Sequence, residues 1–176
     1  VAAALLMSNF QAMLQSLIFQ YRDLETFVFA LNQSVYRITR SDKFITFFIA
    51  EIDINKKQMR YINAGHFPPL LVNNEEIIEL KKGSTVIGAF EKLPFINEGI
   101  VSLKGKCFLF CFTDGLVDVQ NEQGEYFDEQ KLKSFILKNE ALSAAQFNAK
   151  IIETFEKFKG EMEYVDDIAL LTTKIY

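Results

Sequence analysis

Three short segments of the chain carry apolar residues at almost every position: 45–52 (ITFFIAEI), 107–112 (CFLFCF) and 168–173 (IALLTT). Their β-branched and aromatic residues are typical of strands. A sheet with one face in water would alternate apolar and polar side chains, so these strands are expected to be covered on both faces. Because other predicted strands form hairpins, we expect a second sheet on one side of each sheet and helices on the other.

Four segments outside these strands have helical periodicity. The first apolar stripe begins near Val1 and runs to about Ile18, and a second helix is predicted from the capping residue Asp23 to about Ile38. Two more helices are predicted at about 128–139 and 143–159. The fold class is therefore predicted as α+β, a four-layer α-β-β-α sandwich of mostly antiparallel sheets.

The chain is predicted to be a single domain of residues 1–176, because its length suits one domain and no internal linker interrupts it. Its strands are expected to pair as hairpins between the two pairs of helices. The predicted pairs are 44–53 with 59–65, 69–73 with 76–80, and 97–103 with 106–114 across the Lys-Gly-Lys turn.

The composition argues against several functions. A net charge of −4 does not favour nucleic acid, because phosphate contacts need clustered Lys and Arg. No apolar stretch reaches the roughly 18 residues of a membrane span, so no direct membrane contact is expected. The two cysteines, Cys107 and Cys111, lie on one face of a strand but too far apart to bond. They are predicted to be buried free thiols, which indicates a reducing, cytoplasmic setting.

Carboxylates stand at the ends of two of the apolar strands. Asp114 follows residues 107–113, and the pair Asp166 and Asp167 opens the last strand. If these strands are adjacent and antiparallel, the carboxylates converge, and two of them about 4 Å apart repel by roughly 4 kcal/mol at an effective dielectric near 20. A Mg²⁺ or Mn²⁺ ion would relieve that repulsion, and Gly115 allows the tight turn that such a site needs. The alternative is an ordinary Asp-Gly turn beside a solvated strand start.

Four segments together resemble the SpoIIE/RsbU-type bacterial phosphatases, a branch of the PP2C-like, metal-dependent serine/threonine phosphatases. Each segment is a weak signal by itself, but their order and separations fit the family along the whole chain. The segments are 1–14 (VAAALLMSNFQAML), 44–72 with its Ala-Gly-His-x-Pro-Pro signature, 109–127 with Thr-Asp-Gly, and 165–175 with Asp-Asp.

The resemblance implies a fold and a chemistry. It implies the α-β-β-α sandwich and two Mn²⁺ or Mg²⁺ ions that activate a bridging water against phosphoserine or phosphothreonine. By the same resemblance Asp114 and Asp166 are the catalytic metal ligands, and Asp167 is the weaker candidate. The implied substrate is a regulatory protein, a STAS-like anti-sigma-factor antagonist in a partner-switching pathway. The implied location is cytoplasmic, as part of a larger sensor or response-regulator protein.

Two departures from the family pattern affect these expectations. The first family motif, an Asp followed closely by Gly-x-Gly, is expected just before Val1, so we interpret the chain as N-terminally truncated and lacking the N-terminal strands. Such a chain is expected to bind metal weakly, to be a poor enzyme and to form a homo-oligomer through an uncovered sheet edge. Residues 85–90 (TVIGAF) stand where the family often has Pro-Leu-Gly.

His66, the only histidine, has two interpretations. It could support phosphate binding, but its place within Ala-Gly-His-x-Pro-Pro favours a structural role in a turn between strands. Asp53 is interpreted as a turn former. Asp118 is interpreted as an exposed loop acid, with a supporting role beside the metal ligands as the alternative. The main rival function is a catalytically degenerate phosphatase fold used for docking or dimerisation. A thiol enzyme built on Cys107 or Cys111 is disfavoured by their predicted burial.

Overall fold

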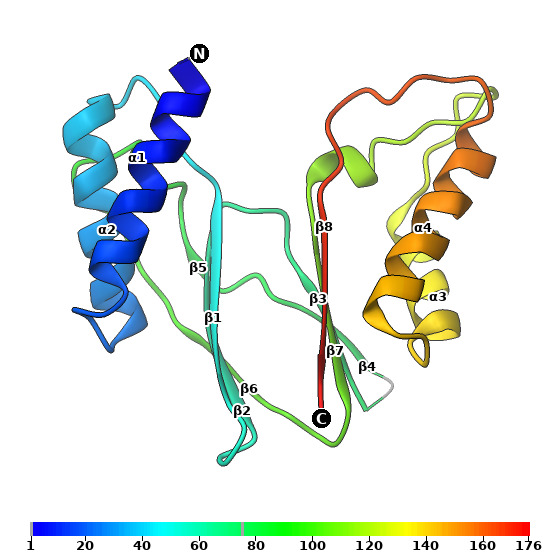
Figure 1. The fold of residues 1–176 in the computed structure, drawn as a ribbon, viewed down its shortest axis with the longest axis horizontal. Helices are drawn as coiled ribbons and strands as arrows, with labels where there is room; N and C mark the ends of the chain where they lie inside the picture. The colour runs from blue at the N-terminus through cyan, green and yellow to red at the C-terminus, as the bar shows by residue number, and fades with distance from the viewer. Residues whose placement is uncertain (1, 75) are drawn as a thin grey trace. The chain divides into compact units, whose positions relative to one another are not determined.

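The computed structural model describes residues 2–74 and 76–176, which fold into two compact units (Figure 1). The first unit comprises the chain up to His66 together with Lys81–Ser102, and the second comprises Phe67–Leu80 and Leu103–Tyr176. Each unit contains one sheet and two α-helices. The predicted α+β class and the mostly antiparallel pairing are confirmed.

The first unit is built around the central strand β2. This strand pairs antiparallel with β1 and β6 and parallel with the short β5. The Asp23 side chain caps α2 by accepting the Thr26 amide at 2.8 Å, and the apolar stripe of α2 then packs against Ile62 and Ala64 of β2. The elements are α1 (Ala2–Leu17), α2 (Leu24–Thr39), β1 (Phe47–Asp53), β2 (Gln58–Ala64), β5 (Gly83–Ser84) and β6 (Gly99–Ser102).

The second unit is an antiparallel sheet in the order β4-β3-β7-β8, with α3 and α4 packed on one face. Phe108, Phe110 and Phe112 occupy every second position of β7, so their side chains lie on one face of the sheet and form the centre of this core. Phe147 of α4 packs among them. The elements are β3 (Leu70–Asn73), β4 (Glu76–Glu79), β7 (Cys107–Phe112), the 3-10 turn η1 (Asp114–Leu116), α3 (Glu129–Asn139), α4 (Ala144–Lys159) and β8 (Leu170–Ile175).

The predicted hairpin across Lys-Gly-Lys is wrong. Strand β6 pairs with β2 in the first sheet, whereas β7 lies between β3 and β8 in the second. A short turn containing Gly105, with φ near 70°, joins strands of different sheets here. The burial pattern explains the difference: β7 is almost entirely buried and needs neighbours on both edges, whereas β6 has exposed positions that suit an edge.

The expectation that three strands are covered on both faces is confirmed only for β7. Strands β1 and β8 each lie at one end of their sheet's strand order, and β1 has no fully buried residue. Leu171 of β8 is 63% exposed. An apolar run shows that side chains can be buried, but it does not distinguish a central strand from an edge strand.

Phe147 should contribute strongly to the stability of the second unit. Its ring centroid lies 4.6 Å from that of Phe108 and 5.2 Å from that of Phe110. Phe147→Ala should lower the free energy of unfolding by about 3–5 kcal/mol, because it removes contacts and leaves a cavity. Urea denaturation followed by circular dichroism measures this, with Leu137→Ala, at a 43% exposed position of α3, as the control. Equal losses in both variants would contradict the packing described.

Candidate functional site

Asp114 begins the 3-10 turn that follows β7. Strand β7 ends at Phe112, and Thr113 precedes the turn in an extended conformation. Leu116, two residues after Asp114, is fully buried in the core of the second unit and anchors the turn. The Asp114 side chain is exposed, and its Oδ1 accepts the Gly115 amide at 3.2 Å. The buried strand therefore ends by presenting a carboxylate to solvent from a fixed turn.

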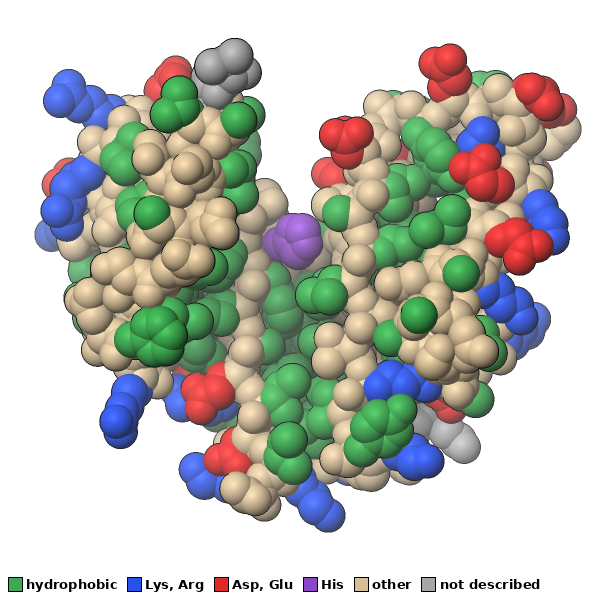
Figure 2. Space-filling view, viewed as in Figure 1, with side chains coloured by type: hydrophobic (Ala, Val, Ile, Leu, Met, Phe, Trp, Pro, Cys, Tyr) green, Lys and Arg blue, Asp and Glu red, His purple; other side chains and the backbone are tan. Residues whose placement is uncertain are grey.

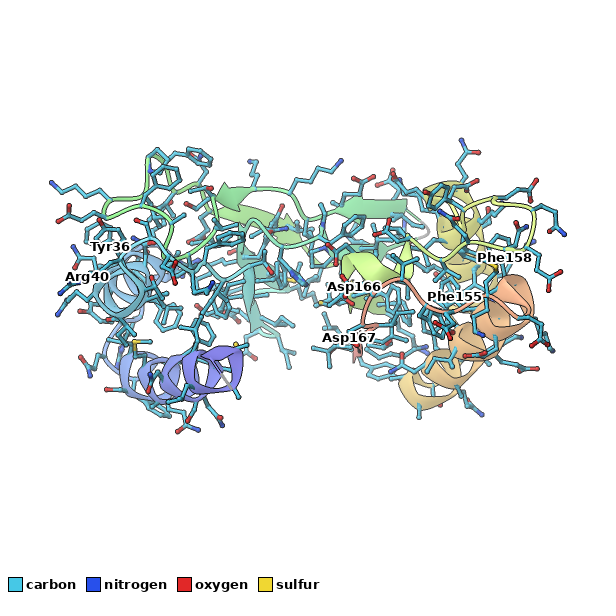
Figure 3. All side chains as sticks on the ribbon, turned by 90° about the horizontal axis from the view of Figure 1, so that it is seen from above. Tyr36, Arg40, Phe155, Phe158, Asp166 and Asp167 are labelled. Carbon is cyan, nitrogen blue, oxygen red and sulfur yellow. The ribbon has the colours of Figure 1, made fainter. Side chains whose placement is uncertain are left out.

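The pair Asp166 and Asp167 lies beside the end of β7. Strands β7 and β8 are antiparallel neighbours, with Phe112 opposite Leu170. Beyond that pair, the Thr113 hydroxyl donates to the Asp167 carbonyl and accepts the Ala169 amide, both at 3.0 Å. The Thr113 side chain therefore extends the strand contact to the segment that carries the two aspartates. Figure 3 shows these aspartates on the loop before β8.

Gly115 allows this close approach. A Cβ atom at this position would lie 2.7 Å from the Asp167 carbonyl oxygen and 3.2 Å from that of Asp166. Any other residue would therefore push the aspartate-bearing backbone away from the turn. The structure thus brings together the segments of Asp114, Gly115, Asp166 and Asp167. Their roles as metal ligands stay a prediction.

The charges of these three carboxylates are not balanced by neighbouring cations. All three side chains are exposed, and within residues 2–74 and 76–176 none takes part in an ion pair. The Asp167 amide donates to Asp166 Oδ1 at 2.7 Å and so orients that carboxylate. Figure 2 shows further acidic side chains at the same end of the unit.

The donor atoms suit a hard cation, but few of them are grouped. Carboxylate oxygens are the ligands that Mg²⁺ and Mn²⁺ prefer. Among the residues that the structure describes, no three His, Cys, Asp or Glu side chains are grouped closely enough to hold a metal ion. Mg²⁺ is commonly bound through one or two carboxylates, with water and substrate phosphate completing its shell. The chemistry of the donors therefore fits such an ion, with part of the shell left to water and phosphate.

His66 belongs to the first unit, directly after β2. Its backbone amide donates to Asn63 Oδ1 at 2.8 Å, and its Nδ1 lies 3.4 Å from the Thr46 hydroxyl. The preceding Gly65 has φ near 69°, and a Cβ there would lie 2.5 Å from Val86 Cγ1. These contacts agree with a role in forming the turn.

The cysteines do not form a reactive site. Both are free, as predicted, but Cys111 is only partly buried rather than buried. Burial raises the pKa of the Cys111 thiol to about 11, so the reactive thiolate is scarce near neutral pH. Cys107 is buried and its thiol donates to Asn73 Oδ1 at 3.3 Å. The thiol-enzyme alternative therefore has no support.

Sequence reasoning missed a groove beside the aspartates. The groove has a volume of about 480 Å³, and its walls include Ile152 of α4, Tyr164, Asp166 and Asp167. These residues come from different segments, so no local motif indicates it. One signal was available: Ile152 is an apolar residue outside the buried stripe of an amphipathic helix.

Comparison with solved structures identifies the class of fold. The SiaA-PP2C domain of Pseudomonas aeruginosa matches the whole chain with a TM-score of 0.86 and 19% sequence identity, over 71% of that chain. The RsbU and RsbW domains of Rv1364c from Mycobacterium tuberculosis match 97% of the chain, and 48% of theirs, with a TM-score of 0.71 and 22% identity. The fold is therefore that of the PP2C-like phosphatases, as predicted.

The chain belongs to the SpoIIE family. It matches the family described as Stage II sporulation protein E (SpoIIE) over residues 1–176. It is 28% identical over 129 residues to Protein IcfG of Synechocystis, covering 73% of the chain and 20% of IcfG. It is 23% identical over 146 residues to Phosphoserine phosphatase RsbU of Bacillus subtilis, covering 82% of the chain and 43% of RsbU. The chain thus spans less than half the length of either relative.

Within the described residues, no helix has the length and apolar character needed to cross a bilayer.

The Thr113 hydroxyl should hold the aspartate segment against β7. Thr113→Val keeps the shape of the side chain but removes both hydrogen bonds, so the Ala169 amide should exchange with solvent much faster. The free energy of unfolding should fall by about 1–3 kcal/mol. Hydrogen exchange followed by NMR measures the first effect, and Thr113→Ser is the matched control because it keeps the hydroxyl. Unchanged exchange at Ala169 in the valine variant would show that the hydroxyl does not hold the segment.

His66→Gln separates the two interpretations of the histidine. If His66 only shapes the turn, the variant should melt at a lower temperature and keep most of any metal-dependent phosphatase activity. Thermal unfolding and p-nitrophenyl phosphate hydrolysis measure the two properties on the same preparation. A deep loss of turnover at unchanged stability would refute the structural interpretation.

Proposed function

We propose that residues 1–176 form one catalytic domain of a Mn²⁺- or Mg²⁺-dependent phosphatase that hydrolyses phosphoserine or phosphothreonine on a regulatory protein. One observation carries the proposal: in a chain of the SpoIIE family, the Asp114 turn is fixed against the Asp166–Asp167 segment at one end of the second sheet. The exposure of these carboxylates supports access by a protein substrate rather than only by a small molecule.

In this proposal Asp114 and Asp166 hold the cation, with Asp167 as the alternative to Asp166. A bound divalent ion lowers the pKa of a coordinated water and screens the charge of the phosphate. Thr113 and Gly115 fix the two backbone segments, and the Asp167 amide orients the Asp166 carboxylate. Solved relatives support metal dependence: the catalytic domain of PstP was described in complex with two manganese ions, and a SpoIIE phosphatase domain was presoaked with Mn.

The proposed substrate is a phosphorylated anti-sigma-factor antagonist of the STAS-like kind. The similarity to Phosphoserine phosphatase RsbU supports a phosphoserine substrate. The match to a structure that contains both RsbU and RsbW domains supports a place in partner switching. A homo-oligomeric, cytoplasmic domain belongs to the same proposal.

A catalytically degenerate fold that serves docking or dimerisation is the second candidate. The observation in its favour is that no three potential ligands are grouped among the described residues. The two candidates differ in a measurable property, because a degenerate fold has no need to bind Mn²⁺ at Asp114.

Substitution of the proposed ligands tests the enzyme directly. In the full-length protein, Asp114→Asn and Asp166→Asn should each reduce Mn²⁺-dependent hydrolysis of p-nitrophenyl phosphate by orders of magnitude, because a neutral amide is a weaker ligand than a carboxylate. Circular dichroism should show an unchanged fold, and Mn²⁺ affinity by calorimetry should fall with activity.

Asp118→Asn is the matched control, since Asp118 is an exposed acid on the same loop. It should behave as wild type. Near-wild-type rates in either ligand variant would exclude the assignment. A full-length wild-type protein with neither Mn²⁺ binding nor hydrolysis would favour the degenerate fold.

A further inference from the structure

The groove beside the aspartates has apolar walls that are open to solvent. Ile152 of α4 is 48% exposed, the half-buried Ile168 and Leu170 contribute further apolar surface, and the buried Phe155 lies behind them. Asp166 and Asp167 form part of the same wall, and Figure 3 shows them in the same part of the second unit as Phe155. The groove therefore begins at the carboxylates of the candidate metal site and continues along α4.

The charges of the groove exclude an anion as its occupant. The described residues that line it include no lysine or arginine. Glu156 is already engaged, because it accepts the Tyr164 hydroxyl at 2.8 Å and pairs with Lys159 at 3.2 Å. The two aspartates have no such partner among the described residues. A phosphate or an acidic side chain would be repelled from the groove, whereas a neutral apolar side chain would bury apolar surface there.

Apart from the two aspartates, the polar side chains that line the groove already have hydrogen-bond partners within it or beside it, which favours an apolar occupant further. Asn148 Oδ1 accepts the Thr172 hydroxyl at 2.5 Å. Burial and the hydrogen bond to Glu156 raise the pKa of Tyr164 to about 12, so its hydroxyl stays a neutral donor. Outside Asp166 and Asp167, which lie at the candidate metal site, these paired groups leave little hydrogen-bonding capacity for a polar side chain.

We propose that this groove binds an apolar side chain of the protein substrate that lies near the phosphorylated residue in sequence, and that it thereby determines sequence specificity. This proposal rests on the proposed phosphatase function. If a divalent cation bound by Asp114 and Asp166 held the phosphate, a substrate residue within about three positions would reach the groove, since an extended chain advances about 3.3 Å per residue. An acidic residue at that position would face Asp167 and be disfavoured. Ile152 is then a specificity-determining residue that does not take part in the chemistry.

Paired phosphopeptides test this specificity. The peptides of each pair contain one phosphoserine and differ at a single position, where one carries Leu and the other Asp. The pairs together cover about three positions on either side of the phosphoserine. At one position the wild-type chain should favour the Leu peptide by about tenfold in kcat/KM. Ile152→Gln should raise KM for that peptide and remove most of the preference, with hydrolysis of p-nitrophenyl phosphate unchanged.

Leu137→Gln is the matched control, because Leu137 is a similarly exposed apolar residue on α3 outside the groove. It should keep the wild-type preference. The proposal would be overturned if Ile152→Gln kept the preference for the Leu peptide. It would also be overturned if the variant lost as much activity on p-nitrophenyl phosphate as on that peptide. If Ile152→Gln changed the oligomeric state measured by light scattering but left the peptide preference unchanged, the groove would be assigned to a second copy of the chain. That result would also overturn the proposal.

A binding measurement separates failure of the groove from failure of the enzyme. If the full-length wild-type protein hydrolyses no phosphate ester, the proposed function fails. Methyl NMR then tests the groove alone: the Ile152 and Ile168 signals should shift on addition of the unphosphorylated Leu peptides but not the Asp peptides. Absence of any such shift would overturn the groove proposal whether or not the chain is a phosphatase.

Discussion

The antiparallel pairing of β7 with β8 is the interaction on which the candidate site depends. Because neighbouring antiparallel strands run in opposite directions, the end of β7 lies beside the start of β8, and two distant sequence motifs meet there. A slip of the register by one residue would turn every side chain of a strand to its other face. The buried phenylalanines of β7 prevent such a slip, and Thr113 continues the contact beyond the last strand pair. Core packing therefore determines where the carboxylates lie.

Much of this arrangement could be predicted because its signals are local. Asp23 and Ser143 mark helix starts through capping, and the structure has α2 and α4 beginning directly after them. The adjacency of β7 and β8 was only a condition for the carboxylate-bearing strand ends to meet, and the structure fulfils it. Asp53 was correctly interpreted as a turn former, since its Oδ1 accepts the Lys56 amide at 2.9 Å.

The errors concern non-local relations. The sequence pattern cannot show that the short Lys-Gly-Lys turn joins strands of two different sheets, because a hairpin and such a connection need the same turn residues. Nor can it show that β1 and β8 are edge strands, since apolar residues occupy both kinds of strand. The groove beside Asp166 was missed for a related reason: Ile152 and Tyr164 contribute to it only after α4 has packed against the sheet.

The electrostatics of the site bear on how the three aspartates and a bound divalent ion would affect the stability of the fold. Carboxylates about 4 Å apart repel by roughly 4 kcal/mol at an effective dielectric near 20, but by only about 1 kcal/mol in water. Because all three aspartates are exposed, water screens the repulsion between their carboxylates in the folded chain. An ion that binds only the folded chain would add about 2.7 kcal/mol of stability at a hundredfold excess over its Kd. Thr113 and Gly115 already hold the two segments together, so such an ion would meet a preformed backbone. Its affinity would then depend mainly on how many further oxygens water and the substrate phosphate supply.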